Sequence, residues 1–177
     1  MNSKTHILIA ALLLTALSPL FGYDKDDLRD LLKKKDCADS LFTSCNLKGV
    51  VLKNIDLSGA NLSGADMTNA VLEKINLDGA ILTDIVLKGA KIRMTTFKKA
   101  VLDDAQLQNT VQQFVDFSDA RLVGADIRGS VFKAAVFKGA NFEGVDVKGT
   151  DFSQSDLSDA IRFDGKSCKP KSYGECR

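Results

Sequence analysis

The side chains that most often perform chemistry are scarce in this chain. It contains one histidine, His6, in 177 residues. His6 lies in an N-terminal segment that we interpret as a cleaved signal peptide, so the mature chain would lack imidazole and any Ser-His-Asp or Cys-His relay. Carboxylates are plentiful, as in Asp103 and Asp104, but none stands apart as an acid–base pair. We predict no catalytic residue, no metal site and no cofactor.

Residues 1–22 have the organisation of a secretory signal. Lys4 precedes a run of 11 largely apolar residues from Ile7 to Leu17, and Pro19 to Gly22 then break the helix. The run is too short for a bilayer, which needs about 20 residues. The alternative is an uncleaved helix that tethers the protein to a membrane. We predict export to the periplasm or outside the cell, without stable membrane insertion after cleavage.

The body of the chain repeats every five residues. A large side chain recurs at 24 successive fifth positions, with Gln112 as the one polar exception. These positions are Phe42, Leu47, Leu52, Leu57, Leu62, Met67, Leu72, Leu77, Leu82, Leu87, Ile92, Phe97, Leu102, Leu107, Gln112, Phe117, Leu122, Ile127, Phe132, Phe137, Phe142, Val147, Phe152 and Leu157. A small or β-branched residue, most often alanine, stands two positions before each, and every glycine between residues 23 and 164 stands two positions after one.

A period of five fits neither a helix nor a simple strand. Within each unit, a small inward residue, a polar outward one and a large inward one make a short extended stretch, and the next two residues turn the chain. Stacked coils of this kind bury the inward columns and pair their backbones along the axis.

The repeats resemble those of the pentapeptide-repeat proteins. Residues 55–67 read IDLSGANLSGADM and residues 140–144 read ANFEG, which match the family consensus A(D/N)LxX. The resemblance spans about 40–160 and implies a right-handed β-helix in which four repeats form one square coil. That gives six coils and a rod roughly 29 Å long at about 4.8 Å per coil. Stacking of Phe97, Phe117 and Phe137 at 20-residue spacing supports this coil size, although leucine and phenylalanine also interchange by chance.

We therefore predict an all-β protein, a right-handed quadrilateral β-helix (β-solenoid) of about six coils with a short N-terminal capping α-helix. The expected organisation is a signal peptide at 1–22, a capping helix and loop at 23–38, the pentapeptide-repeat β-helix at 39–161 and a C-terminal cap or tail at 162–177. The helix is expected from Asp24 to Lys35, with Leu28, Leu31 and Leu32 on one side. It would cover the first coil, since open solenoid ends promote association.

The four cysteines form two pairs, each separated by eight positions, with one pair at each end of the expected rod. An even count in an exported protein indicates disulfides. Bonds between the two ends are excluded because bonded Cα atoms must lie within about 7 Å. We predict the bonds Cys37–Cys45 and Cys168–Cys176. For Cys45 the alternative is a free thiol that fills a small inward position.

Two outward columns could form an interaction surface. Val51, Val71, Val111 and Val131 align at 20-residue spacing, interrupted by Lys91. They form either an apolar docking stripe or β-branched residues suited to exposed strands. On another face the cations Lys48, Lys88, Arg128 and Lys148 run beside Asp66, Asp126 and Asp146. This column is either an ion-binding or polyanion-binding stripe or, as we favour, a set of charges that cancel.

Gln112 and Phe114 mark the one irregularity in the repeats. Glutamine in an inward column needs hydrogen-bond partners. Phe114 stands at a turn position where other repeats have glycine. We favour a bulge that turns Val111 or Phe114 inward. The functional alternative is an exposed phenylalanine used for binding.

Three functions compete. The first, which we favour, is an exported structural or interaction module with an unknown protein partner, no nucleic acid partner and no enzymatic activity. The second is a DNA-mimicking, gyrase-binding protein of the quinolone-resistance type, as the resemblance to the family implies. Against it stand the export signal, a mature charge of zero once Lys4 is removed and the lack of a visible C-terminal dimerisation helix. The third is an enzyme, for which no distinct acid–base pair exists.

Overall fold

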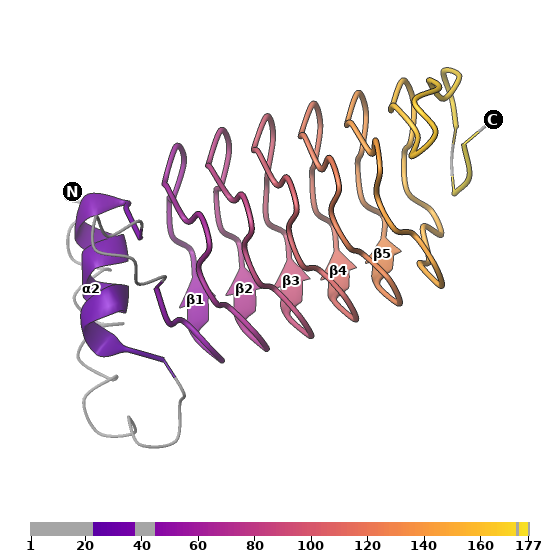
Figure 1. Ribbon diagram of the computed structural model, residues 1–177. Coiled ribbons are helices and arrows are strands. Elements are labelled where there is room, and N and C mark those ends of the chain that lie inside the picture. Colours follow the sequence, from indigo (N-terminus) through magenta and orange to yellow (C-terminus); the bar gives the residue numbers. More distant parts are fainter. Residues whose placement is uncertain (1–22, 38–44, 173, 177) are drawn as a thin grey trace.

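The chain forms a stack of coils with a helix across its N-terminal end (Figure 1). The computed structural model describes residues 23–37, 45–172 and 174–176. Its regular elements are α2 (Lys25–Lys34), β1 (Val51–Lys53), β2 (Val71–Glu73), β3 (Lys91–Arg93), β4 (Val111–Gln113) and β5 (Val131–Lys133). The predicted signal peptide at 1–22 lies outside the described residues.

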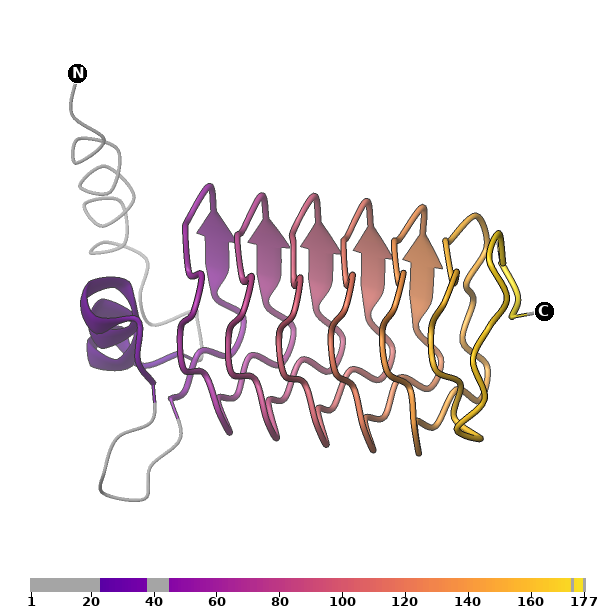
Figure 2. The same ribbon diagram turned by 90° about the horizontal axis from the view of Figure 1, so that it is seen from above.

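The five strands form one parallel sheet in the order β1-β2-β3-β4-β5. Each strand pairs with the strand that begins 20 residues later, so Val51 lies opposite Val71 and Val71 opposite Lys91. One coil therefore takes 20 residues, which is four repeats. Figure 2 shows the strands side by side along one wall of the rod.

The other walls pair through single bridges at the same spacing, such as Asn46 with Asp66 and Asn61 with Ile81. The predicted fold class, a right-handed quadrilateral β-helix with a short N-terminal helix, is confirmed. The coil count differs somewhat from the six expected, and within the described residues five coils carry a strand. Beyond β5 the 20-residue register continues through bridges alone, such as Val131 with Asp151 and Asn141 with Ile161.

The five-residue period places the large side chains on the axis of the rod. Leu62, Leu82 and Leu102 are at most 1% exposed. Between them the small column is filled by alanines such as Ala80, which is fully buried. The backbone turns behind each large residue, and neighbouring coils are joined by hydrogen bonds such as Leu82 N–H to Val101 O, at 2.7 Å. Burial of both columns is what drives the coil to close.

A stack of phenylalanine rings fills the axis in the C-terminal half of the rod. The Phe117 ring lies parallel to Phe97 at 4.5 Å and to Phe137 at 5.1 Å between centroids. Phe132 stacks on Phe152 at 5.4 Å and meets Phe137 edge-on at 5.0 Å. Offset parallel and edge-on rings contribute stability beyond the area they bury.

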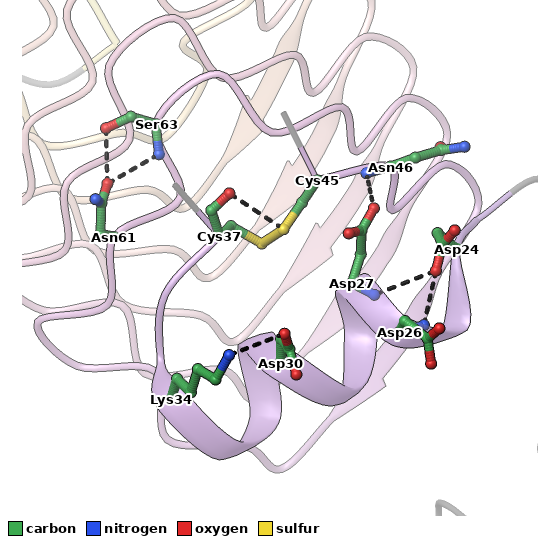
Figure 3. The surroundings of a disulfide bond; sticks show 10 residues. All are labelled: Asp24, Asp26, Asp27, Asp30, Lys34, Cys37, Cys45, Asn46, Asn61 and Ser63. Atoms are coloured by element: carbon green, nitrogen blue, oxygen red, sulfur yellow. Dashed lines mark hydrogen bonds and ion pairs between the residues drawn. A yellow bond between two sulfur atoms is a disulfide. The ribbon is translucent and has the colours of Figure 1, made fainter. Parts of the chain in front are cut away.

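The helix α2 closes the N-terminal end, as predicted. The Asp24 carboxylate caps it by accepting from Asp26 N–H at 2.7 Å. Leu28 and Leu31 are buried against the first coil. Asp27 accepts from the backbone N–H of Asn46 at 2.7 Å, which joins the helix to that coil (Figure 3). In the described part of the chain no helix has the length and apolar character needed to span a membrane.

Both predicted disulfides are present in the structure. Cys37 and Cys45 are bonded with their Cα atoms 5.4 Å apart, beside the helix (Figure 3). Cys168 and Cys176 are bonded at the other end, with a Cα–Cα distance of 5.1 Å. There the tail returns over the last coil, where Cys168 N–H donates to Ala160 O and Leu157 N–H to Ser172 O, each at 2.7 Å. Each bond thus fixes one end of the rod.

Candidate interaction surface

The outward side of the five-stranded sheet carries the predicted surface residues. We call the outward side chains of β1 to β5 and of the turn residues that follow them the sheet face. Val51, Val71, Val111 and Val131 form one row across the sheet, with Lys91 in register at its centre. Val51 is 49% exposed and Val111 is 42% exposed. The valines therefore lie in one row and face outward.

The favoured interpretation of the irregularity, a bulge, is wrong. Strand β4 pairs in unbroken register with β3 and β5, so Gln112 lies between Ile92 and Phe132. Gln112 stays fully buried, whereas Phe114 is 58% exposed. No bulge forms because Phe114 adopts the left-handed conformation that the turn requires, with φ 53°. That conformation is costly for a bulky side chain, by about 1 kcal/mol or more.

A short polar chain in the core explains how Gln112 is tolerated. Its Nε2 donates to Thr110 Oγ1 at 3.1 Å, and Thr110 Oγ1 donates to Ser130 Oγ at 3.0 Å. Ser130 in turn donates to the carbonyl of Leu107 at 2.5 Å. The Gln112 Oε1 atom is buried and has no hydrogen-bond partner among the described residues. Half of the amide is therefore satisfied and half is not.

Replacing this glutamine with leucine, Gln112→Leu, is expected to stabilise the protein. The unsatisfied amide oxygen costs about 1–3 kcal/mol, and leucine fits a column otherwise filled by apolar residues. Chemical denaturation of both proteins would show a higher midpoint for the variant at unchanged slope. A leucine variant less stable than the native chain would mean that the polar chain contributes more than the orphaned oxygen costs.

The sheet face is also cationic at its centre. Lys91 and Arg93 are exposed on β3. They line an open depression of about 290 Å³ together with Val71 on β2 and Val111 on β4. Glu73 lies on the rim and forms an ion pair with Lys53 at 3.0 Å. The arrangement offers cations flanked by apolar side chains.

The sequence analysis missed Met94 and Arg93 and assigned no role to Lys91. Met94 is 47% exposed and occupies the turn position one coil before Phe114. Lys91 was treated only as an interruption of the valine row, and Arg93 was not considered. The 20-residue spacing that aligned the valines would also have found Met94, had it been applied to the turn positions.

In the second predicted column two of the four cations, Lys48 and Arg128, pair with carboxylates. Lys48 lies 3.1 Å from Asp66. Arg128 lies 2.6 Å from Asp126 and 3.5 Å from Asp146. Hydrogen bonds from Arg128 lower the pKa of the Asp126 carboxyl to about 2. Lys48 and Arg128 therefore offer little free charge to an ion or polyanion, whereas Lys88 and Lys148 form no ion pair within the described residues.

Among the described residues no group of three or more His, Cys, Asp or Glu side chains could hold a metal ion. The internal void among the leucines of the N-terminal coils measures only about 10 Å³, which is about the space of one water molecule. What the described residues offer a partner is therefore their outer walls.

These features define a repetitive scaffold in which the inward columns are fixed by packing and the outward side chains of the walls are not. The family model for pentapeptide repeats matches eight copies, at residues 45–84 and 116–154. The chain belongs to the pentapeptide-repeat family, whose members are generally structural or interaction modules. No curated protein sequence matches the chain.

Several solved structures are similar. HetL, a pentapeptide repeat protein involved in heterocyst differentiation regulation in the cyanobacterium Nostoc sp. strain PCC 7120, is 26% identical with a TM-score of 0.39, over 69% of this chain and 59% of HetL. The pentapeptide repeat protein Rfr23 from Cyanothece 51142 is 22% identical with a TM-score of 0.37, over 77% and 97%. QnrB1, a plasmid-mediated fluoroquinolone resistance protein, is 21% identical with a TM-score of 0.37, over 71% and 61%.

These matches leave the function open. The chain spans less than two thirds of HetL and of this QnrB1 structure. The low TM-scores carry no argument about what the chain binds. Any function must therefore be argued from its own surface.

Proposed function

We propose that this chain is an exported, non-enzymatic interaction module that binds a protein partner through the sheet face. The observation that carries the proposal is Phe114, a large apolar side chain held exposed in a left-handed turn conformation. It lies on the same wall as exposed Val111, at the other end of β4, and one coil from exposed Met94. Clustered exposed apolar residues, unlike scattered ones, are typical of protein interaction sites.

Export is supported by the two disulfides. Such bonds persist in oxidising compartments and are rare in the cytosol. The apolar segment at 1–22 would direct the chain there, to the periplasm or outside the cell. We place the functional protein in such a compartment.

The substitution Phe114→Ser is expected to remove partner binding and leave the fold intact. The phenyl ring is exposed, so its loss should change the free energy of unfolding by less than about 0.5 kcal/mol. The measurement is a pull-down from the envelope fraction of the producing organism, with the native chain and the variant as baits.

The matched control is Phe163→Ser, which removes an equally exposed phenylalanine, 50% accessible, near the C-terminal end. We expect the control to retain the partner. A protein captured equally by all three baits would contradict a role for the sheet face. A large loss of stability in Phe114→Ser would instead show that the ring supports the fold.

The gyrase-binding alternative is disfavoured by the charge of the sheet face. A DNA mimic must present dense negative charge along the rod, whereas the sheet face is cationic at Lys91 and Arg93. A gyrase supercoiling assay with the purified protein should show neither inhibition nor protection from a quinolone.

A further inference from the structure

Charge is distributed unevenly over the walls of the rod, although the chain as a whole carries a formal charge of only +1. The sheet face, which runs from residues 51–54 in the first coil to residues 131–134 in the fifth, has five cations and one carboxylate. That carboxylate, Glu73, already pairs with Lys53. Lys91 and Arg93 are exposed and form no ion pair within the described residues. The five cations are Lys53, Lys74, Lys91, Arg93 and Lys133.

A second wall has the opposite character. We call the outward residues of 80–84, 100–104, 120–124 and 140–144 the acidic face. Its carboxylates are Asp84, Asp103, Asp104 and Glu143, and its one cation, Arg121, donates to Asp103 from Nε at 2.9 Å. Asp84 and Asp104 are exposed and form no ion pair in the described part of the chain.

The two faces lie on opposite walls of the rod. Four walls make one 20-residue coil, so a residue and the one ten positions later lie half a coil apart. Opposite walls run in opposite directions. The first outward residue of a strand therefore lies directly across the rod from the last outward residue of the opposite wall. Lys91 lies across from Asp103 in this way, and Val111 across from Val123.

We infer that the sheet face of one copy binds the acidic face of a second copy, with the two rods side by side and parallel. A sideways shift with a small adjustment along the axis brings Lys91 of one rod to the end of the acidic face of the next, where Asp84 and Asp104 are exposed and Asp103 is held by Arg121. The same shift brings Val111 against Val123. The inference rests on the proposed function, because both require that the protein acts through its outer walls. It identifies the partner as a second copy of this chain.

The size of the contact predicts weak association. The sheet is about 19 Å along the axis and about 10 Å across, from a strand spacing of about 4.8 Å and three residues per strand. Stable interfaces bury about 800 Å² on each partner. The contact is therefore reversible and depends on charge, and a chain of low net charge offers little overall repulsion to oppose it.

The test is sedimentation velocity of the purified chain at low and high salt. In about 20 mM salt we expect the weight-average sedimentation coefficient to rise with protein concentration up to about 1 mM, as for a weak complex. In about 0.5 M salt, where the Debye length is only a few ångströms, the rise should disappear. A chain that sediments as a monomer throughout overturns the inference.

Reversed-charge variants locate the contact. Lys91→Glu/Arg93→Glu and Asp84→Lys/Asp104→Lys should each abolish association alone, and an equimolar mixture of the two should restore it. The fold should accept both pairs of substitutions. Glutamate already occupies the strand position of Arg93 one coil earlier, at Glu73. Lysine already adopts the left-handed turn conformation of Asp84 and Asp104, at Lys74 and Lys99. Thermal melting would confirm that both variants fold.

The matched control is Lys88→Glu/Lys148→Glu, which makes the same change in net charge on a different wall. It should associate like the native chain. A mixture that stays monomeric, or a control that loses association equally, overturns the inference. If the native chain is monomeric while its sheet face still captures another protein in the pull-down, the self-association fails and the proposed function stands.

Discussion

The substitution Phe117→Ala is expected to lower the free energy of unfolding by about 3–5 kcal/mol, as for other buried phenylalanines. Phe117 is fully buried, with Phe97 and Phe137 stacked on its two sides and Phe132 meeting it edge-on at 6.3 Å. Its removal leaves a cavity in the centre of the stack that neighbouring coils cannot close without breaking their hydrogen-bond register. Chemical denaturation followed by circular dichroism measures the change.

The Phe114→Ser variant serves as its control, because the two phenylalanines are three residues apart and Phe114 is 58% exposed whereas Phe117 is fully buried. The control should unfold with nearly native stability. Equal losses in the two variants would contradict the division of the chain into a buried axis and an exposed wall.

The second large effect is expected from the N-terminal disulfide. The double substitution Cys37→Ala/Cys45→Ala should cost about 2–3 kcal/mol, since the bond closes a short loop in the unfolded chain. Alanine is chosen because it fills the small inward column of Cys45 in other repeats, so that packing changes little at that position. The measurement is hydrogen exchange, which should accelerate first in α2 and the coil that contains β1.

The matched control removes the other bond, with Cys168→Ala/Cys176→Ala. Faster exchange is then expected at the C-terminal end, because each coil contacts only its neighbours. If both double variants exchange like the native chain, the bonds contribute nothing to the closure of the ends.

The arrangement of the core followed directly from the sequence. A large residue at every fifth position predicts the inward columns. The coil length of 20 residues came from the resemblance to the pentapeptide-repeat family, and it is this length that stacks the rings of Phe97, Phe117 and Phe137. The cysteine pairing followed as well, because a rod separates its two ends by more than a disulfide can span.

The five-residue period could not predict the structure of the irregular repeat at Gln112 and Phe114. The period determines which residues point inward, but the turn conformation depends on hydrogen bonds between coils, such as that from Phe114 N–H to Lys133 O at 3.0 Å. These bonds hold Phe114 at positive φ as firmly as the corresponding residues Lys74 and Met94. Tolerance of Gln112 likewise depends on Thr110 and Ser130, which meet it only once the coils stack.

The surface was only partly predictable for a related reason. Sequence spacing aligned the valines, but an excess of charge on one wall is recognised only when it is compared with the charge on the other walls. The excess of cations at Lys91 and Arg93 and of carboxylates at Asp84 and Asp104 cancels in the composition and separates only in the folded rod.

The separation between a buried axis and an exposed sheet face is tested most directly by thiol labelling of two single-cysteine additions, Ala105→Cys and Phe114→Cys, in the native protein. Ala105 is fully buried in the small inward column, where the chain already accommodates Cys45, and Phe114 is 58% exposed. We predict rapid labelling at position 114 and labelling at position 105 only after unfolding. Rapid labelling at 105, or protection at 114, would contradict the account.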